Sequence, residues 1–344
     1  MTGTMRAMVF HGPGDLRAEE LPVPTPDVGE VVLKIEAALT CGTDVKVLRR
    51  GHPVMIPVVP TVFGHEFAGT VTAVGRGVRR VKSGDRVVAA NSAPCGACPP
   101  CRAGRANLCE DLLFVNGAYG EFIRLPARLV ERNLVQLAPT TPAARAAFAE
   151  PLACALGAVE RARVESGQTV VIFGHGPLGC LLGMVAAARK ARVIIVGKQG
   201  WRLERVKELA LGECVDATTT DAVDAVRGST GGRGGDVTFD ATGRPEAWES
   251  AVAAASRGGS VVFFGGCAPG TVITLDTRRV HYEELTLLGA FHHTPELIRK
   301  AITLIETHEL VPDGLLTHRM PLAQVREALE LTARGNALKV LIDP

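Results

Sequence analysis

The order of hydrophobic and polar positions divides the chain into two regions of different texture. Up to about residue 145, short alternating or apolar runs lie between glycine and proline turns, which is typical of β-strands. From Pro142 the chain is rich in alanine, and predicted strands alternate with predicted helices. This alternation predicts a parallel sheet with crossover helices. The predicted strands of the first region are 31–38, 68–74, 86–90 and 121–125; those of the second are 169–173, 192–196, 237–240 and 260–264, with helices at 178–189, 201–211 and 245–256.

The C-terminal part adds an apolar run at 285–291, helices at 295–309 and 324–333, and a closing strand at 338–342. We expect this tail to return to the first domain. The apolar stretch from Thr169 to Ala188 is nearly long enough to span a bilayer, but the sequence Gly174-His-Gly-Pro interrupts it, so a buried strand, turn and helix explain it better. The first ten residues lack the apolar segment of a signal peptide, and we expect a cytoplasmic protein without a membrane partner.

Composition supports a globular protein and argues against a nucleic-acid partner. The chain has 344 residues, enough for two domains, with 47% hydrophobic and 22% charged residues. Lys and Arg total 38 and Asp and Glu total 36, so the net charge is only +2. Nucleic-acid binders usually carry a basic excess, and with 4% aromatic residues the chain also offers little for stacking on bases.

A glycine-rich turn follows the predicted strand 169–173 and opens a helix. Its sequence Gly174-His-Gly176-Pro177-Leu178-Gly179 fits the pattern G-x-G-x-x-G. The first glycine permits a tight turn, the second lets the backbone approach a pyrophosphate, and the third allows close packing of helix on strand. An ordinary glycine turn is the alternative, but the surrounding alternation favours a dinucleotide site.

The end of the next strand favours NADP over NAD. An NAD site usually has an acid there for the ribose hydroxyls. Here the strand ends in Gly197-Lys198, and the first acid is Glu204, already within the helix. Lys198, with Arg202 or Arg205, could pair with a 2′-phosphate, although all three could simply be solvated.

Four cysteines, Cys95, Cys98, Cys101 and Cys109, crowd into one short segment. Four thiolates satisfy tetrahedral zinc and leave no open position, which predicts a structural zinc site. An iron–sulfur cluster and a zinc ribbon that reads nucleic acid are the alternatives. The near-neutral charge argues against the ribbon, and structural zinc is favoured.

Three further segments place metal-ligand residues beside glycine or proline: Cys41-Gly-Thr43-Asp44, Gly64-His65-Glu66 and Glu150-Pro151. With Gly84-Asp-Arg-Val, the cysteine cluster and the glycine-rich turn, in this order, the chain resembles the zinc-dependent medium-chain dehydrogenases, and among them the polyol or sorbitol dehydrogenase-like branch. The resemblance covers essentially the whole chain.

The resemblance implies an α/β fold with a GroES-like β-rich catalytic domain, residues 1–148 and 286–344, and a Rossmann doubly wound parallel-sheet domain, residues 149–285. It also implies two zinc ions per chain and a homodimer or homotetramer. The expected reaction is hydride transfer between a secondary alcohol of a polyol, sugar or cyclitol-like substrate and NAD(P), or its reverse from a ketone. A general alcohol dehydrogenase and a catalytically silent nucleotide-binding relative are the rival functions.

Carried over by position, Cys41 and His65 bind the catalytic zinc, with the remaining places shared among Glu66, Glu150 and a water or substrate oxygen. Which glutamate ligates the metal stays open. Asp44 orients the His65 imidazole, and Thr43 places its hydroxyl on the substrate oxygen. Further cofactor contacts are expected at Thr242, Gly265, Phe291 and His292.

The chain departs from the family pattern at Lys46, at Gly157 and at the pair His292-His293; Gly157 stands where relatives often have a histidine, and no mechanism is attached to that change. Lys46 stands where many relatives have a histidine that ends a proton relay, and a protonated lysine is a poor base. Proton release could therefore run through water or the cofactor ribose, or Lys46 could bind cofactor. His292 and His293 follow Phe291, where sorbitol-type enzymes show an Arg–Tyr pair. We expect these histidines to face the cofactor or substrate, with surface histidines at a domain junction as the alternative.

Overall fold

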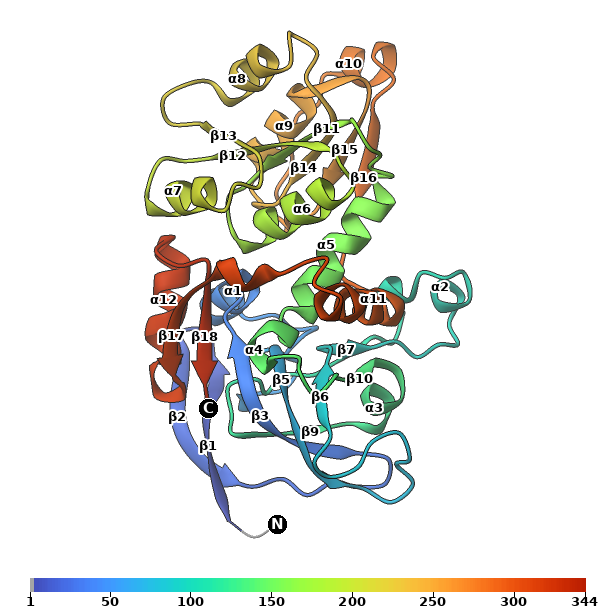
Figure 1. The fold of residues 1–344 in the computed structure, drawn as a ribbon, viewed down its shortest axis with the longest axis vertical. Helices are drawn as coiled ribbons and strands as arrows, with labels where there is room; N and C mark the ends of the chain where they lie inside the picture. The colour runs from blue at the N-terminus through green and yellow to red at the C-terminus, as the bar shows by residue number, and fades with distance from the viewer. Residues whose placement is uncertain (1–2) are drawn as a thin grey trace. The chain divides into compact units, whose positions relative to one another are not determined.

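The structure is a computed structural model that describes residues 3–344, and its chain forms two compact units. One unit contains the chain up to Ala153 together with His293–Pro344, and the other contains Cys154–His292. The first unit is thus assembled from two segments far apart in sequence (Figure 1).

The first unit is built on strands, as its alternating pattern predicts. Its strands are Thr4–Gly12 (β1), Asp15–Pro22 (β2), Val31–Leu39 (β3), Thr61–Val62 (β4), Glu66–Val74 (β5), Arg86–Ala89 (β6), Ser92–Ala93 (β7), Leu113–Phe114 (β8), Phe122–Leu125 (β9), Leu134–Gln136 (β10), Leu316–Pro321 (β17) and Lys339–Asp343 (β18). Its helices are Gly42–Arg50 (α1), Pro99–Arg102 (α2), Ala127–Asn133 (α3), Ala143–Ala146 (α4), Pro295–Glu306 (α11) and Val325–Arg334 (α12), with short 3₁₀ turns at Ala106–Leu108, Pro312–Leu315 and Leu322–Gln324.

The main sheet of this unit runs in the order β10-β6-β5-β3-β18-β17, and β9 also pairs with β3. Alternate side chains of β3 and β5, such as Leu33, Ile35 and Phe67, enter one continuous core. The C-terminal strand β18 joins this sheet beside β3, with Leu341 opposite Leu39. The predicted return of the tail to the first domain is therefore confirmed.

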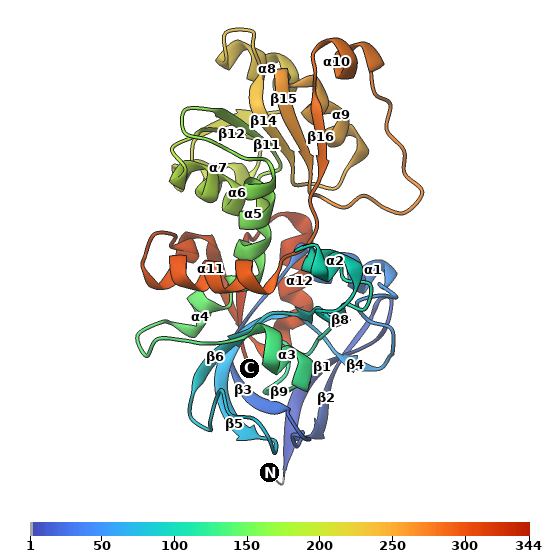
Figure 2. The same cartoon turned by 90° about the vertical axis from the view of Figure 1, so that its right-hand side faces the viewer.

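The second unit is a six-stranded parallel sheet in the order β13-β12-β11-β14-β15-β16. Its strands are Thr169–Phe173 (β11), Arg192–Gly197 (β12), Glu213–Asp216 (β13), Gly235–Asp240 (β14), Ala255–Phe263 (β15) and Thr286–Gly289 (β16). Its helices are Pro177–Ala188 (α6), Trp201–Glu208 (α7), Ala222–Ser229 (α8), Pro245–Ala253 (α9) and Thr277–Tyr282 (α10), and Ala149–Arg161 (α5) leads into it. Helices α6 and α7 cover one face and α8 and α9 the other, so the sheet is doubly wound as expected (Figure 2).

In the second unit, the sequence pattern missed β13, α8 and α10. The strand is four residues long and only Val215 of it is fully buried, so it carries almost no hydrophobic signal. The prediction for Thr169–Ala188, by contrast, is confirmed: the stretch forms the strand β11, a turn and the helix α6.

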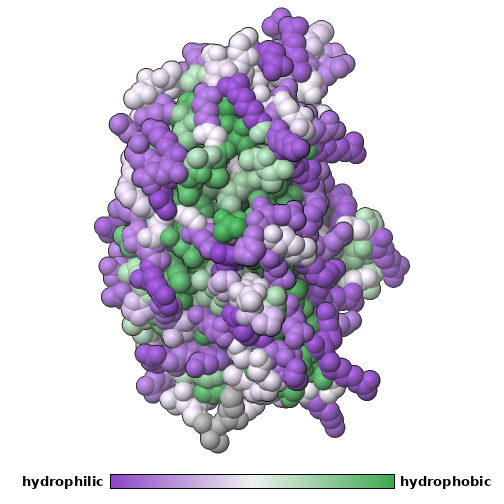
Figure 3. All heavy atoms as spheres, in the orientation of Figure 1, coloured by the Kyte–Doolittle hydropathy of each residue, from purple (hydrophilic) through white to green (hydrophobic). Residues whose placement is uncertain are grey.

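Within residues 3–344, no helix is both long and apolar enough to cross a membrane. Figure 3 shows mostly polar residues on one face, with apolar residues gathered around α6.

Candidate functional site

Cys41 caps the N-terminus of helix α1; its backbone is extended and its sulfur accepts the Thr43 N–H at 3.4 Å. The Asp44 carboxylate completes the capping box by accepting the Cys41 N–H at 3.0 Å. Because helix N-termini stabilise negative charge, this position suits a thiolate. The same cap fixes Thr43 in the first turn of α1, half-buried and next to the sulfur.

Asp44 also holds His65, which directly precedes β5. The Nδ1 atom of His65 lies 2.8 Å from Asp44 Oδ1, and both residues are buried. The buried Tyr119 hydroxyl donates to Asp44 Oδ2 at 2.6 Å. Burial alone would lower the pKa of His65, but Asp44 and Cys41 outweigh it and raise that pKa well above its ordinary value. The imidazole is thus held through Nδ1, which directs Nε2 to serve as a metal ligand.

Glu66 lies in a buried ion pair that the sequence did not reveal. Both oxygens of its carboxylate accept hydrogen bonds from Lys339 Nζ, one at 2.6 Å, and both residues are at most 1% exposed. Burial raises the pKa of Glu66, while the charge of Lys339 opposes that rise. For Lys339, the charges of Glu66 and Cys41 outweigh burial and raise its pKa. Lys339 lies in β18, 273 residues after Glu66 in the sequence, so no local sequence motif predicts this ion pair.

The arrangement fits a metal ion. One ligand atom each of Cys41, His65 and Glu66 lie within 4.8 Å of one another. Thiolate, imidazole and carboxylate form a donor set that zinc accepts. Glu150, near the start of α5, does not belong to this group; it lies beside the buried His293, whose Nε2 is 3.9 Å from Glu150 Oε1 and 3.0 Å from Asn91 Oδ1. Neither Asn91 nor Tyr119 was singled out from the sequence, because each lies outside the recognised motifs.

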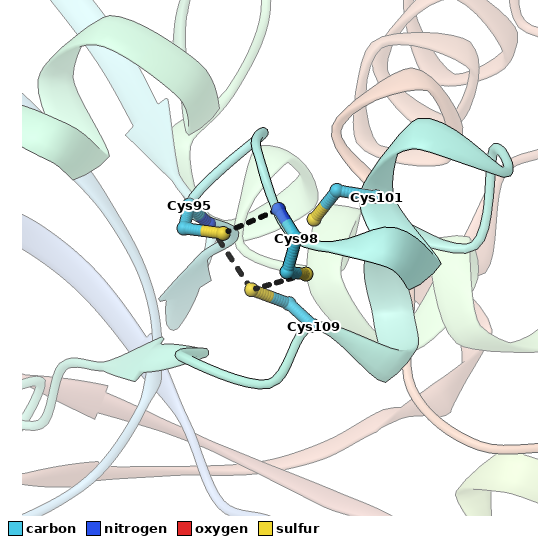
Figure 4. Close-up of side chains that lie close together, drawn as sticks. All are labelled: Cys95, Cys98, Cys101 and Cys109. Carbon is cyan, nitrogen blue, oxygen red and sulfur yellow. Dashed lines mark hydrogen bonds between the residues drawn. The ribbon is translucent and has the colours of Figure 1, made fainter.

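The four cysteines of the predicted structural site point toward one another (Figure 4). Their sulfurs all lie within 4.8 Å of one another, and those of Cys98 and Cys109 are 3.9 Å apart. A tetrahedral zinc with bonds of about 2.3 Å separates its sulfurs by roughly 3.8 Å, so the cluster fits this ion. Backbone N–H groups of Ala97 and Cys98 donate to the Cys95 sulfur and lower the pKa of that thiol to about 6.

We expect Cys98→Ser to destabilise the protein rather than impair its chemistry. A zinc ion in a closed four-thiolate site contributes folding free energy. A loss of about 2 kcal/mol lowers the Tm by roughly 4–8 °C, which calorimetry resolves. Zinc content should fall by one ion per chain. Cys267→Ser, at a half-buried cysteine outside the cluster, is the control. A Cys98→Ser protein with full zinc content and unchanged Tm would contradict the assignment.

The glycine-rich turn joins β11 to α6 and has the geometry of a nucleotide-binding loop. Gly174 has a φ of +124°, and a Cβ at Gly179 would lie 1.9 Å from the Gly174 carbonyl oxygen. A Cβ at Gly176 would meet no atom within 4 Å, so open space lies beside that backbone. Pro177 and Leu178 begin α6, whose unpaired N–H groups can receive phosphate oxygens. These features fit a dinucleotide.

The residues at the end of β12 differ in exposure. Lys198 is exposed and Arg202, in the first turn of α7, is half-buried, while Arg205 pairs with Glu208 at 2.7 Å. Asp216, at the end of β13, accepts the N–H of Gln199 at 3.0 Å and also binds Thr218. The sequence did not point to this acid, because it lies on the neighbouring strand β13 and not in the segment that directly follows β12.

The remaining predicted cofactor residues lie in the second unit. Thr242 donates its hydroxyl to Asp240 at 2.6 Å, and a Cβ at Gly265 would lie 2.1 Å from the Gly243 nitrogen, so the loops after β14 and β15 pack tightly together. Phe291 is 56% exposed and stacks on His292, with ring centroids 5.4 Å apart.

Comparison with known proteins agrees with both parts of the chain. Residues 27–135 match the family described as alcohol dehydrogenase GroES-like domain, and residues 177–307 match that described as zinc-binding dehydrogenase. The chain is 31% identical over 350 residues to a sorbitol dehydrogenase of Bacillus subtilis, covering 99% of this chain and 97% of that protein. It is 33% identical over 362 residues to an erythritol/L-threitol dehydrogenase of Mycolicibacterium smegmatis, covering 99% and 98%.

Among solved structures, it resembles a protein of Sinorhizobium meliloti 1021 assigned as a zinc-binding dehydrogenase and bound to NADP. The TM-score is 0.91 at 29% identity, covering 99% of this chain and 100% of that one.

Proposed function

The chain belongs to the zinc-dependent medium-chain dehydrogenase family, in its polyol (sorbitol) dehydrogenase-like branch, and from this premise we propose that it transfers hydride between a secondary alcohol and a nicotinamide dinucleotide. The substrate class is a polyol, sugar or cyclitol-like molecule, in line with the sorbitol and erythritol/L-threitol enzymes it is similar to. The observation that carries the proposal is the convergence of Cys41, His65 and Glu66 within 4.8 Å.

In this proposal Cys41 and His65 hold the catalytic zinc. When bound, zinc acts as a Lewis acid that lowers the pKa of an alcohol oxygen. Glu66 balances the charge of the site as half of an ion pair with Lys339, whose ammonium group competes with the metal for its oxygens. The carboxylate ligand in this proposal is either Glu66, which has an oxygen close to the ligand atoms of Cys41 and His65, or Glu150. A second zinc is assigned to Cys95, Cys98, Cys101 and Cys109, which gives two per chain.

Thr43 is proposed to hydrogen-bond the substrate oxygen through its hydroxyl and to relay the substrate's proton, releasing its own proton onward as it receives that of the substrate. Thr43 precedes Asp44 in the first turn of α1, and its backbone N–H donates a hydrogen bond to the Cys41 sulfur. The residue therefore lies next to a proposed metal ligand. The cofactor would lie on the turn Gly174–Gly179, with NADP preferred because no acid ends β12. Thr242, Gly265, Phe291 and His292 are proposed as further cofactor contacts, and the working form as a homodimer or homotetramer.

A substrate screen tests this function. Purified protein loaded with zinc should reduce NADP⁺ in the presence of some member of a panel of polyols, sugars and cyclitols, followed by nicotinamide absorbance. Removing the metal with a chelator should abolish the reaction, and adding zinc should restore it. Simple monoalcohols serve as the comparison. Faster turnover of monoalcohols would favour a general alcohol dehydrogenase, and dinucleotide binding without turnover of any alcohol would favour a silent relative.

A further inference from the structure

In the second unit, the imidazole of His175 fills the space that a side chain at position 197 would need. His175 is the second residue of the glycine-rich turn, and its ring lies against Gly197, the last residue of β12. A Cβ at Gly197 would lie 2.5 Å from His175 Cγ and 2.7 Å from its Nδ1. Because real Cβ atoms do not approach so closely, a side chain at position 197 and the present ring position exclude each other.

Position 197 is where the strand ends, and an acid at the end of this strand would bind the ribose hydroxyls of NAD. The sequence alone shows only that the acid is missing. The structure adds that the space beside Gly197, which the side chain of such an acid would need, is occupied by the imidazole of His175. This residue belongs to the turn proposed to bind the pyrophosphate. Resting on the proposed function, we propose that His175 and Arg202 together bind the 2′-phosphate of NADP, and that His175 excludes a ribose-binding carboxylate from position 197.

Charge supports this pairing. Burial, followed by the positive charge of Arg202, lowers the pKa of His175 to about 4, while Asp216 acts in the opposite direction. Arg202 is therefore close enough to act on the ring. At neutral pH the imidazole is uncharged and can donate a hydrogen bond, while the guanidinium carries the charge that a phosphate requires.

Asp216, the acid at the end of the neighbouring strand β13, does not replace the carboxylate that is missing at position 197. The Asp216 carboxylate accepts hydrogen bonds from the Gln199 N–H at 3.0 Å, from the Thr218 N–H at 2.9 Å and from the Thr218 hydroxyl at 2.6 Å. These donors tie it to the turn that leads into α7. Asp216 thus shapes the turn on which Lys198 and Gln199 stand.

Titration with NADPH and NADH, followed by nicotinamide fluorescence, tests the inference without reference to turnover. The unmodified protein should bind NADPH more tightly. His175→Ala and Arg202→Leu should each weaken NADPH binding about tenfold and leave NADH binding within about twofold, since a lost hydrogen bond to a charged group has this size. Arg192→Leu is the matched control, because that arginine is exposed in an ion pair with Glu213. It should change neither constant.

A double substitution separates the two parts of the inference. Gly197→Asp alone should weaken both dinucleotides, because the carboxylate and the ring compete for one space. His175→Ala combined with Gly197→Asp should bind NADH about tenfold more tightly than Gly197→Asp alone. Equal NADH binding by the single and the double variant would overturn the steric part. Should Gly197→Asp fail to fold, as judged by circular dichroism, the NADPH-to-NADH ratios of His175→Ala and Arg202→Leu decide the inference.

Two results for the unmodified protein distinguish this inference from the proposed function. Tighter binding of NADH than of NADPH would overturn the inference and leave a zinc-dependent dehydrogenase standing. Binding of neither dinucleotide would overturn the proposed function and, with it, the inference.

Discussion

Cys41→Ser is expected to abolish turnover while the fold and dinucleotide binding survive. A serine hydroxyl is a much weaker zinc ligand than a cysteine sulfur, so the site loses its sulfur ligand and much of its affinity for zinc. Without the Lewis acid, kcat/KM should fall at least about a thousandfold, which corresponds to ~4 kcal/mol of transition-state stabilisation. The nucleotide-binding turn lies in the other unit, so the dissociation constant for NADPH should change by less than about twofold.

Cys214→Ser is the matched control for this experiment. Cys214 lies half-buried in β13 and belongs to none of the three groups of possible metal ligands found among residues 3–344. Its substitution should leave kcat/KM within about twofold. Zinc analysis should show one ion fewer in Cys41→Ser and an unchanged count in the control. Full activity of Cys41→Ser would show that the catalytic metal is held elsewhere or is not used.

Lys339→Met is expected to cost about 3–5 kcal/mol of folding free energy, the usual result of leaving one buried charge without its partner. Methionine fills a similar volume, so the loss reports the charge of Glu66 and not a cavity. Urea unfolding of the zinc-loaded protein measures the difference. The double variant Glu66→Gln with Lys339→Met should recover most of the loss, because it removes both charges.

An exposed ion pair provides the comparison. Lys207 and Glu204 lie 2.8 Å apart with side chains 47% and 60% exposed. Lys207→Met should change the free energy of unfolding by less than about 1 kcal/mol. A loss of that small size for Lys339→Met would show that Glu66 is protonated in the folded protein and needs no cation.

The fold class and the family could be predicted because their signals are local. The turn Gly174–Gly179 encodes its geometry within six residues, and the alternation around it predicts the parallel sheet. The strand β13 left no such signal, because it lies at the edge of the sheet and buries little. The hydrogen bond between Asp44 and His65, which the resemblance implied, is present at 2.8 Å.

The partners that complete the candidate site could not be read from the sequence. Lys339 looks like any lysine near the end of a chain until β18 is placed beside β3, where it meets Glu66. The contact of His175 with Gly197 likewise depends on the register of β11 and β12 and on the path of the turn after them. Such pairings arise from tertiary structure. The roles assigned to the metal and cofactor residues stay predictions until the variants are measured.

The position of β18 also determines the order in which the chain can assemble during synthesis. The N–H of Val340 donates to the Thr40 hydroxyl at 3.0 Å across 300 residues of sequence, whereas the unit Cys154–His292 is contiguous. Domains generally fold as units as they leave the ribosome, and distant contacts form late. The nucleotide-binding unit therefore has all its residues while the end of β3 is paired with β5 alone, without β18 on its other side, and Glu66 still lacks its cation. We expect nascent chains stopped before residue 339 to bind dinucleotide yet remain open to proteolysis in their N-terminal half.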